Sequence, residues 1–219
     1  YSPRFRSPKM SDYNPKNFGE INQAYLDNER TVWVRNFRVA CILAFIFVPA
    51  GSSLDYWVYP KQFTEFFCYR LICSALLLFI WWFVKTSIGL RFYRVLGLIL
   101  PALPTICCSL MIYKTTGENS PYYAGLNLVL LGAAIILRWT FTDSLLAFLE
   151  ALGSYLAACL LHGPIQNPSL FFNNLYFIFV TGTFVVIGSY FYNQLRFREF
   201  AFRYELDKNK KELEETNRK

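Results

Sequence analysis

Apolar residues in this chain are gathered into six long blocks and do not alternate with polar residues. The blocks occupy approximately residues 37–55, 64–84, 94–113, 122–138, 143–161 and 175–195. A helix rises about 1.5 Å per residue and the hydrocarbon core of a bilayer is about 30 Å thick, so blocks of this length favour membrane-spanning helices. We therefore expect an all-α membrane protein, a six-transmembrane helix bundle with short connections.

Composition supports the membrane class and excludes several others. The chain is 54% hydrophobic and only 17% charged, whereas an average soluble domain is about 25% charged. Its net charge of +7 comes from basic residues in loops and at the ends, so we expect no nucleic-acid partner. The six cysteines lie inside apolar blocks and His162 is the single histidine, so we expect no metal site.

The distribution of basic residues predicts the orientation. If both termini are cytoplasmic, 19 of the 22 Lys and Arg residues fall on the cytoplasmic side, as the positive-inside rule requires. The three others are Lys61, Arg70 and Lys114. This bias favours six spans over five or seven.

Three regions follow from this layout. Residues 1–35 form a cytoplasmic N-terminal arm, 36–195 the six-helix input domain, and 196–219 the start of a cytoplasmic linker that leads to an output domain beyond Lys219. Within the arm, residues 18–35 form either an amphipathic helix or an irregular tether. In the helical alternative Ile21, Tyr25 and Trp33 face the lipid headgroups.

The linker carries a short heptad pattern that continues directly from the sixth helix. Leu206 and Leu213 are seven residues apart and suit core position a, while Phe202, Asn209 and Thr216 fall at position d. An Asn at a core position fixes the register of a parallel coiled coil. We expect a homodimer through this coiled coil; the alternative is a lone solvated helix.

Polar residues in the outer half of the predicted bundle suggest a ligand site. Ionisable groups in a bilayer are costly and usually face the bundle interior. The candidate ligand-binding residues are Arg70, Asn127, Asp55, Tyr123, Trp57 and His162. One interpretation is an aromatic-walled pocket in which Arg70 anchors a small, largely apolar ligand. In the other, Arg70 pairs with Asp55 or Glu65, and the aromatic residues form the interfacial belt.

A second polar group is predicted near the inner side. Glu150 lies about two turns into the fifth helix, and Arg38 and Arg138 are its nearest partners by depth. We expect either a structural salt bridge or a signal-coupled switch. Together with Leu206, Asn209 and Leu213, these residues are the candidate signal-coupling residues.

The linker and two bundle segments resemble parts of bacterial sensor histidine kinases. The linker is Arg203–Lys219, and the segments are Ser53-Leu-Asp-Tyr-Trp-Val-Tyr-Pro60 and Tyr122-Tyr-Ala-Gly-Leu-Asn-Leu-Val-Leu-Leu131. The resemblance implies a dimeric receptor of the bacterial inner membrane. Its output domain would use ATP and Mg²⁺ to phosphorylate a histidine and then pass the phosphoryl group to a response regulator. The segment itself contains no catalytic motif and needs no cofactor.

Two other functions share parts of this pattern. Similar six-span modules precede class III adenylate and guanylate cyclases, where the domain is a membrane anchor or regulator. A stand-alone small transporter is the third alternative, which the absence of an internal repeat in the sequence disfavours.

Overall fold

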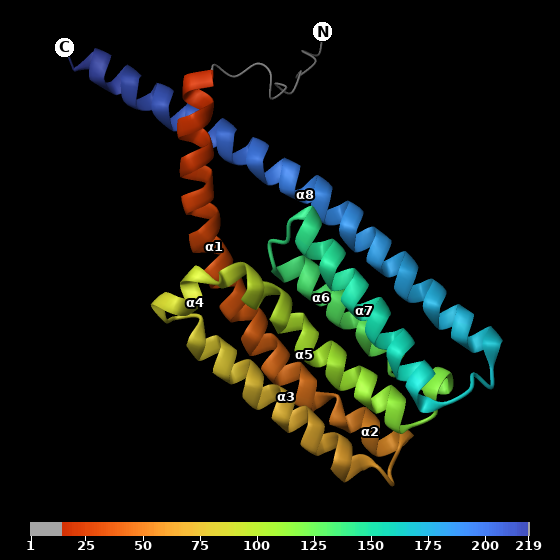
Figure 1. Ribbon diagram of the computed structural model, residues 1–219. Coiled ribbons are helices and arrows are strands. Elements are labelled where there is room, and N and C mark those ends of the chain that lie inside the picture. The colour runs from red at the N-terminus through yellow and green to blue at the C-terminus, as the bar shows by residue number, and fades with distance from the viewer. Residues whose placement is uncertain (1–14, 219) are drawn as a thin grey trace. The chain divides into compact units, whose positions relative to one another are not determined.

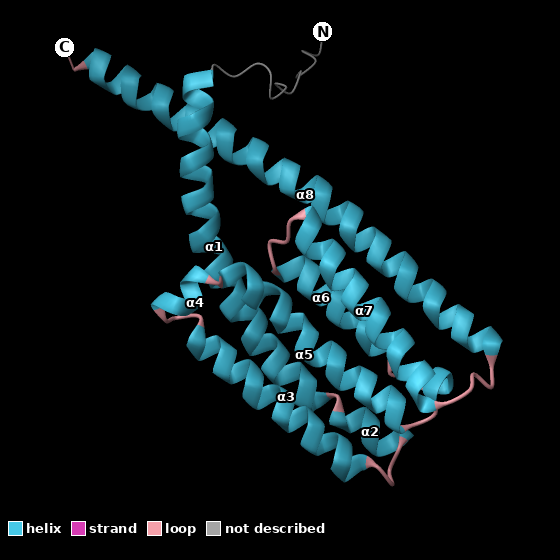
Figure 2. Ribbon diagram, in the orientation of Figure 1, coloured by secondary structure: helices cyan, strands magenta, loops and turns pink. Residues whose placement is uncertain are grey.

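The computed structural model describes residues 15–218, and every regular element within that range is helical (Figures 1 and 2). The elements in chain order are α1 (Pro15–Ala50), α2 (Ser52–Val58), α3 (Phe63–Phe83), α4 (Ser87–Arg91), α5 (Tyr93–Lys114), the 3₁₀ turn η2 (Gly117–Asn119), α6 (Tyr123–Ile136), α7 (Phe141–His162) and α8 (Pro168–Asn217). The predicted all-α class is confirmed. Residues 1–14 of the predicted arm lie outside the described range.

Five segments are long and apolar enough to cross a membrane: Ile21–Val58, which joins α1 and α2, and helices α3, α5, α7 and α8. Helix α6 is equally apolar but has 14 residues, about 21 Å at 1.5 Å per residue. That length is less than the roughly 30 Å of a bilayer core. The structure therefore supports five of the six expected spans, and the sixth stays a prediction.

Local sequence signals explain several helix boundaries. The first apolar block is predicted as one helix over 37–55, but α1 ends at Ala50 and α2 begins at Ser52. Pro49 and Gly51 stand at this break and both weaken helical continuity. Helix α7 starts with a capping box, in which Thr140 accepts from the Asp143 amide and the Asp143 side chain accepts from the Thr140 amide. Such reciprocal bonds satisfy donors that a helix start leaves unpaired.

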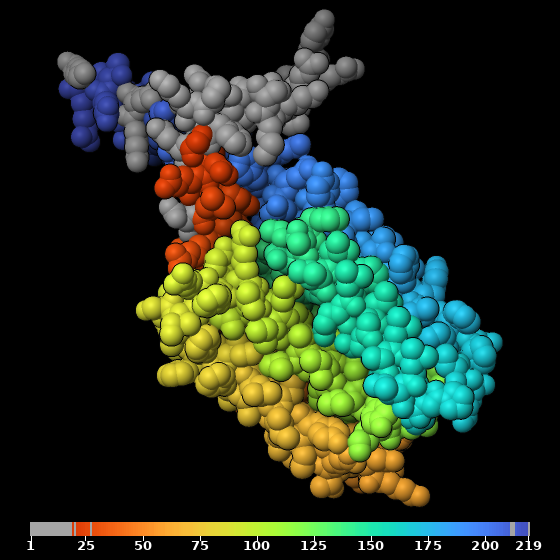
Figure 3. Space-filling model, viewed as in Figure 1, coloured from red at the N-terminus to blue at the C-terminus, as the bar shows by residue number. Residues whose placement is uncertain are grey.

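The chain divides into two compact units, and α1 and α8 contribute to both. The larger unit, Trp33–Asn193, is a helix bundle built around α5. Helix α5 packs against α3, α6 and α7. Its Met111 and Ile112 are fully buried, as are Leu77 of α3 and Tyr155 of α7. In Figure 3, α3, α5, α7 and the adjoining part of α8 appear as successive bands on one face.

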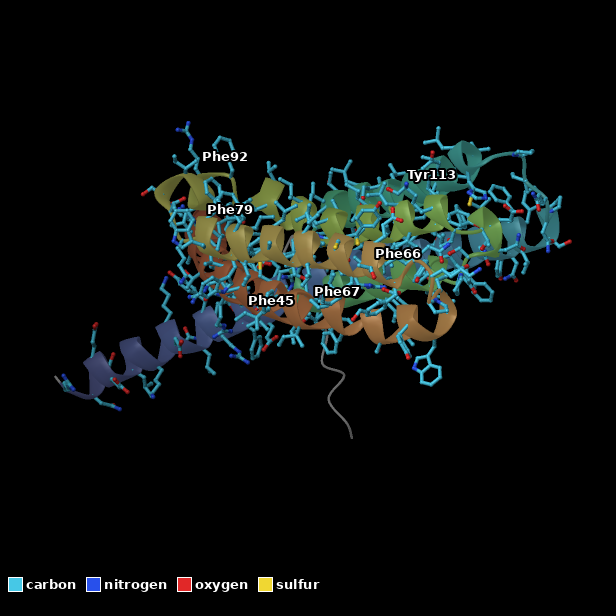
Figure 4. The ribbon with its side chains drawn as sticks, turned by 90° about the horizontal axis from the view of Figure 1, so that it is seen from below. Phe45, Phe66, Phe67, Phe79, Phe92 and Tyr113 are labelled. Carbon is cyan, nitrogen blue, oxygen red and sulfur yellow. The ribbon has the colours of Figure 1, made fainter. Side chains whose placement is uncertain are left out.

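Small residues allow close packing of α8 on α7. A Cβ atom added at Gly182 would lie 2.0 Å from a ring carbon of Phe148, and Phe148 packs edge-on against Phe179 at 5.7 Å. In contrast, many apolar side chains point away from the bundle, including Phe79 and Phe92, which lie toward one end of it in Figure 4. Outward apolar surface of this extent is typical of helices that face lipid.

The smaller unit contains residues 15–32 and 194–218 of the described chain. Residues 18–35 are helical, as one of the two alternatives expected, and belong to the longer α1. The prediction that Ile21 and Tyr25 face headgroups is wrong. Both are buried, because the ring of Tyr25 packs edge-on against Phe197 and Phe200 of α8, at 5.1 and 5.4 Å.

Trp33 also points into the protein. It belongs to the larger unit, where its ring stacks on Phe37 at 4.8 Å and meets Tyr93 edge-on at 5.0 Å. Only 6% of its surface is exposed. The predicted headgroup-facing role of Trp33 is therefore also wrong, because α5 covers this face of α1.

Candidate functional site

The bundle interior contains an ion pair between α2 and α3. Asp55 is fully buried and Arg70 is 8% exposed. The guanidinium binds the carboxylate in a bidentate manner, with Nε to Oδ2 at 2.7 Å and Nη2 to Oδ1 at 2.9 Å. Bidentate Arg–carboxylate pairs combine strong charge-assisted bonds with a fixed relative orientation.

The end of α1 is built to receive this guanidinium. Arg70 Nη1 donates to the carbonyl of Val48 at 3.0 Å. This carbonyl lies in the last turn of α1, where helix carbonyls lack partners and a positive charge is favoured. A Cβ atom at Gly51 would come within 2.5 Å of Arg70 Nη1. The glycine is therefore needed for the close approach of the arginine to the helix end.

Tyr122 extends the ion pair to the start of α6. Its hydroxyl donates to Asp55 Oδ1 at 2.7 Å, so the carboxylate accepts three hydrogen bonds. The Tyr122 ring packs edge-on against Phe66 at 5.8 Å. Asp55 thus links α2, α3 and α6, and removing one member of such a buried pair typically costs about 3–5 kcal/mol.

Glu118 forms a second polar cluster, at the loop before α6. Its Oε1 accepts from the backbone N–H groups of Gln166 and Asn167, both at 2.8 Å. Its carbonyl accepts from Asn174 Nδ2 at 2.8 Å. These bonds fasten the 3₁₀ turn η2 to the loop before α8 and to the first turns of α8.

The environment of Glu118 favours its charged form. Burial raises the pKa of this carboxyl, but the N–H groups of Asn167, of Glu118 itself and of Gln166, together with nearby His162, act in the opposite direction. Their combined effect is larger, so the pKa lies below its ordinary value. Donors directed at a carboxylate stabilise the ionised form.

Two further bonds complete what we call the polar network, defined as Asp55, Arg70, Tyr122, Glu118 and the two contacts described here. Tyr59 and Thr116 share a hydroxyl–hydroxyl bond at 3.0 Å. His162 Nδ1 lies 2.8 Å from the carbonyl of Tyr113, a residue that Figure 4 shows toward the same end as Phe66. Together with the bonds to Val48 and Asn174, these contacts tie together α1, α2, α3, α5, η2, the start of α6, α7 and α8 at this end.

The structure brings only some of the predicted ligand-binding residues together. Arg70 and Asp55 are bonded directly, which is the ion-pair alternative expected from the sequence. His162 lies in the same network but bonds to Tyr113, and Trp57 is 81% exposed beside Tyr56. Tyr123 is half-buried against the core. Asn127 has a buried Oδ1 without a hydrogen-bond partner among the described residues.

The predicted salt bridge of Glu150 does not form. Arg38 lies over the ring of Trp81, with 5.5 Å from its Cζ to the ring centre, and so is directed toward α3. Glu150 is on α7, and its Oε1 is buried without a hydrogen-bond partner among the described residues. In the described part of the chain it has no ion pair, to Arg38, Arg138 or any other residue.

A groove of about 430 Å³ lies between α6 and α8, where the sequence suggested no site. Its walls are mainly apolar and come from the end of α6, Trp139 and the part of α8 from Phe184 to Tyr192. The groove is thus at the opposite end of α6 from Tyr122. Within the described residues, no three His, Cys, Asp or Glu side chains are grouped as metal ligands would be.

Sequence reasoning missed Glu118 and Asn174. Both are polar residues at element ends, where polar residues are common, and no spacing marks them.

The comparison that decides the class of protein is with family models: the MASE8 family, a family of membrane-associated sensor domains, matches residues 53–207. The chain belongs to the MASE8 family.

The MASE8 match covers every residue of the polar network, and it continues along α8 to Asp207. The apolar helices agree with this membership, so the protein is a multi-pass membrane sensor domain. No curated protein and no solved structure matches the chain.

Proposed function

We propose that this MASE8 domain is the signal-input module of a dimeric sensor histidine kinase in the bacterial inner membrane. It senses a small apolar or amphipathic ligand and passes a conformational change through α8 to a C-terminal kinase. The observation that carries this proposal is that α8 has two different parts, one buried in the bundle core and one with exposed apolar side chains. The helix places Ile178 and Val185 in the bundle core and then presents Phe202, Leu206 and Leu213 as exposed apolar side chains.

The exposed residues of α8 support pairing with a second copy. Leu206 is 62% exposed and Leu213 is 66% exposed, although both are large and apolar. With Phe202 and Asn209 they follow the heptad spacing of a coiled-coil seam. We define Phe202, Leu206, Asn209 and Leu213 as the apolar stripe. Both termini of each copy are cytoplasmic in this proposal, and the kinase would serve a response regulator.

Arg70 is the proposed ligand anchor, acting by exchange of partners. Its guanidinium already binds Asp55 and the Val48 carbonyl. A ligand oxygen that takes over Arg70 would leave Asp55 with the Tyr122 hydroxyl as its remaining partner. The two pairings of Arg70, with Asp55 or with the ligand, would be the two states of the bundle. The ligand shifts the population toward the state that it binds better.

The decisive experiment uses membranes that contain the full-length parent, incubated with labelled ATP and Mg²⁺. Acid-labile, base-stable label on the protein indicates phosphohistidine and supports the proposal. A cyclic nucleotide in the supernatant without protein label would transfer the domain to a nucleotide cyclase. Neither product would overturn both assignments and favour a stand-alone function.

A further inference from the structure

The part of α8 beyond Gln194 has two chemically different faces. One face carries the exposed apolar stripe. The other carries Arg196, which is 7% exposed, Ala201, which is 1% exposed, and the rings of Phe197 and Phe200. The stripe is available to a second copy, whereas the other face is covered within the same chain.

The covering element is the N-terminal part of α1. Ile21, Tyr25 and Glu29 are spaced by four residues and therefore lie along one face of the helix. Ile21 is 2% exposed and the Tyr25 ring lies between Phe197 and Phe200. Glu29 Oε2 lies 3.1 Å from Arg196 Nη1, with side chains that are 18% and 6% exposed.

The two faces point in nearly opposite directions. At about 100° per residue, the centre of Arg196, Phe197 and Phe200 is roughly 150° from the centre of Phe202, Leu206 and Leu213. A rotation of α8 about its axis by one residue would thus disturb both faces together. Contact on the covered face therefore determines where the apolar stripe points.

We propose that Ile21, Tyr25 and Glu29 form a clamp that sets the rotation of α8 at its exit from the bundle and so presents the apolar stripe to the second copy. The clamp rests on the proposed dimeric function and adds a regulated contact to it. Its ion pair is largely buried, and a buried polar pair is best suited to fixing register. Release of the clamp lets α8 rotate and misaligns the stripe.

Amide hydrogen exchange of residues 194–205, measured on the full chain in lipid nanodiscs, tests the clamp directly. In Tyr25→Ala we expect exchange about tenfold faster, because local opening becomes easier when the aromatic contacts are lost. Leu26→Ala is the matched control, since Leu26 is apolar, adjacent and 52% exposed. This control is expected to leave the exchange unchanged.

Charge reversal provides a second variant with its own rescue. Glu29→Arg and Arg196→Glu are each expected to speed exchange in the same segment, and the doubly reversed chain is expected to recover most of the protection. Unchanged exchange in Tyr25→Ala, or no recovery in the double variant, would overturn the clamp.

Oxidative cross-linking between copies at Leu206→Cys separates the clamp from the dimer. The unsubstituted chain is the background control, because Cys68 is its one exposed cysteine among the described residues. With the clamp intact we expect efficient cross-linking, and Tyr25→Ala should reduce it several-fold. Absence of cross-linking with normal exchange protection would refute the dimer but leave the clamp contact. Faster exchange with undiminished cross-linking would refute the rotational role.

Discussion

At the level of single residues, Asp55 and Arg70 form a buried charged pair that stabilises the bundle only while both members are present. Arg70 and Asp55 stand out because ionisable groups are rare inside apolar helices. Their partnership was one of two alternatives, and it is the one that forms. Nothing in the sequence pattern assigns Tyr122 to this pair, yet its hydroxyl donates the third hydrogen bond to Asp55. Such a bond joins residues 67 positions apart, and nothing in local spacing encodes it.

Replacing Arg70 tests whether the ion pair is structural, functional or both. Arg70→Met leaves a buried carboxylate without its counter-charge and should lower the free energy of unfolding by about 3–5 kcal/mol. Arg70→Met combined with Asp55→Leu removes both charges and should restore most of that loss. Thermal unfolding in detergent measures the effect, and the ligand response should be absent in both variants. A normal response in the double variant would show that Arg70 is not the anchor.

Glu118 predicts a defined dependence of stability on pH. Its pKa in the folded protein lies below its ordinary value, so its ionised form stabilises the fold. This stabilisation is complete above the unfolded pKa of about 4.3 and is lost as pH falls through the lower folded value. Glu118→Gln should flatten unfolding curves across this acidic range. An equally steep pH dependence in the variant would assign the effect to other carboxyl groups.

At the level of elements, apolar blocks located every long helix but not the breaks within them. The first block contains the break at Pro49 and Gly51, and the same glycine admits the Arg70 side chain, a tertiary requirement that the block pattern does not show. The last helix extends from Pro168 to Asn217, so the predicted boundary at 195 is a change of surface chemistry within one helix. The heptad pattern predicts this continuity, because it follows the sixth apolar block directly.

Two glycines of α8 provide a matched test of helix packing. Gly182→Ala forces a methyl group into the Phe148 ring, and overpacking of this kind costs about 1–3 kcal/mol. Gly188 has no atom within 4 Å of an added Cβ, so Gly188→Ala should be neutral or stabilising by up to about 1 kcal/mol through helix propensity. Unfolding in detergent compares the two. Equal losses would mean that α7 does not pack on α8 at Gly182.

At the level of the whole molecule, α6 decides the topology. If α6 crosses the membrane, Asn119 and Thr142 lie on opposite sides, and both termini are on the same side. Cysteines introduced at these exposed positions can be labelled on intact cells with an impermeant maleimide. We expect labelling of Asn119→Cys and protection of Thr142→Cys until the cells are opened, with Ser87→Cys as a second protected position. Labelling of both Asn119→Cys and Thr142→Cys would reduce the bundle to five spans.

The exit of α8 determines how the whole receptor converts bundle motion into output. If α8 acts as a rigid, register-sensitive helix, each residue inserted after Arg203 rotates the following stripe by about 100°, while the clamp before it stays in place. Insertions of one to seven residues should therefore change the output of the full-length parent with a period of about seven, because a heptad insertion restores the seam. Insertions of three or four residues should recover partial output, since each is close to one helical turn. An output that declines steadily with insertion length would indicate a flexible tether, and the signal would then depend on proximity of the output domains, not on rotation of α8.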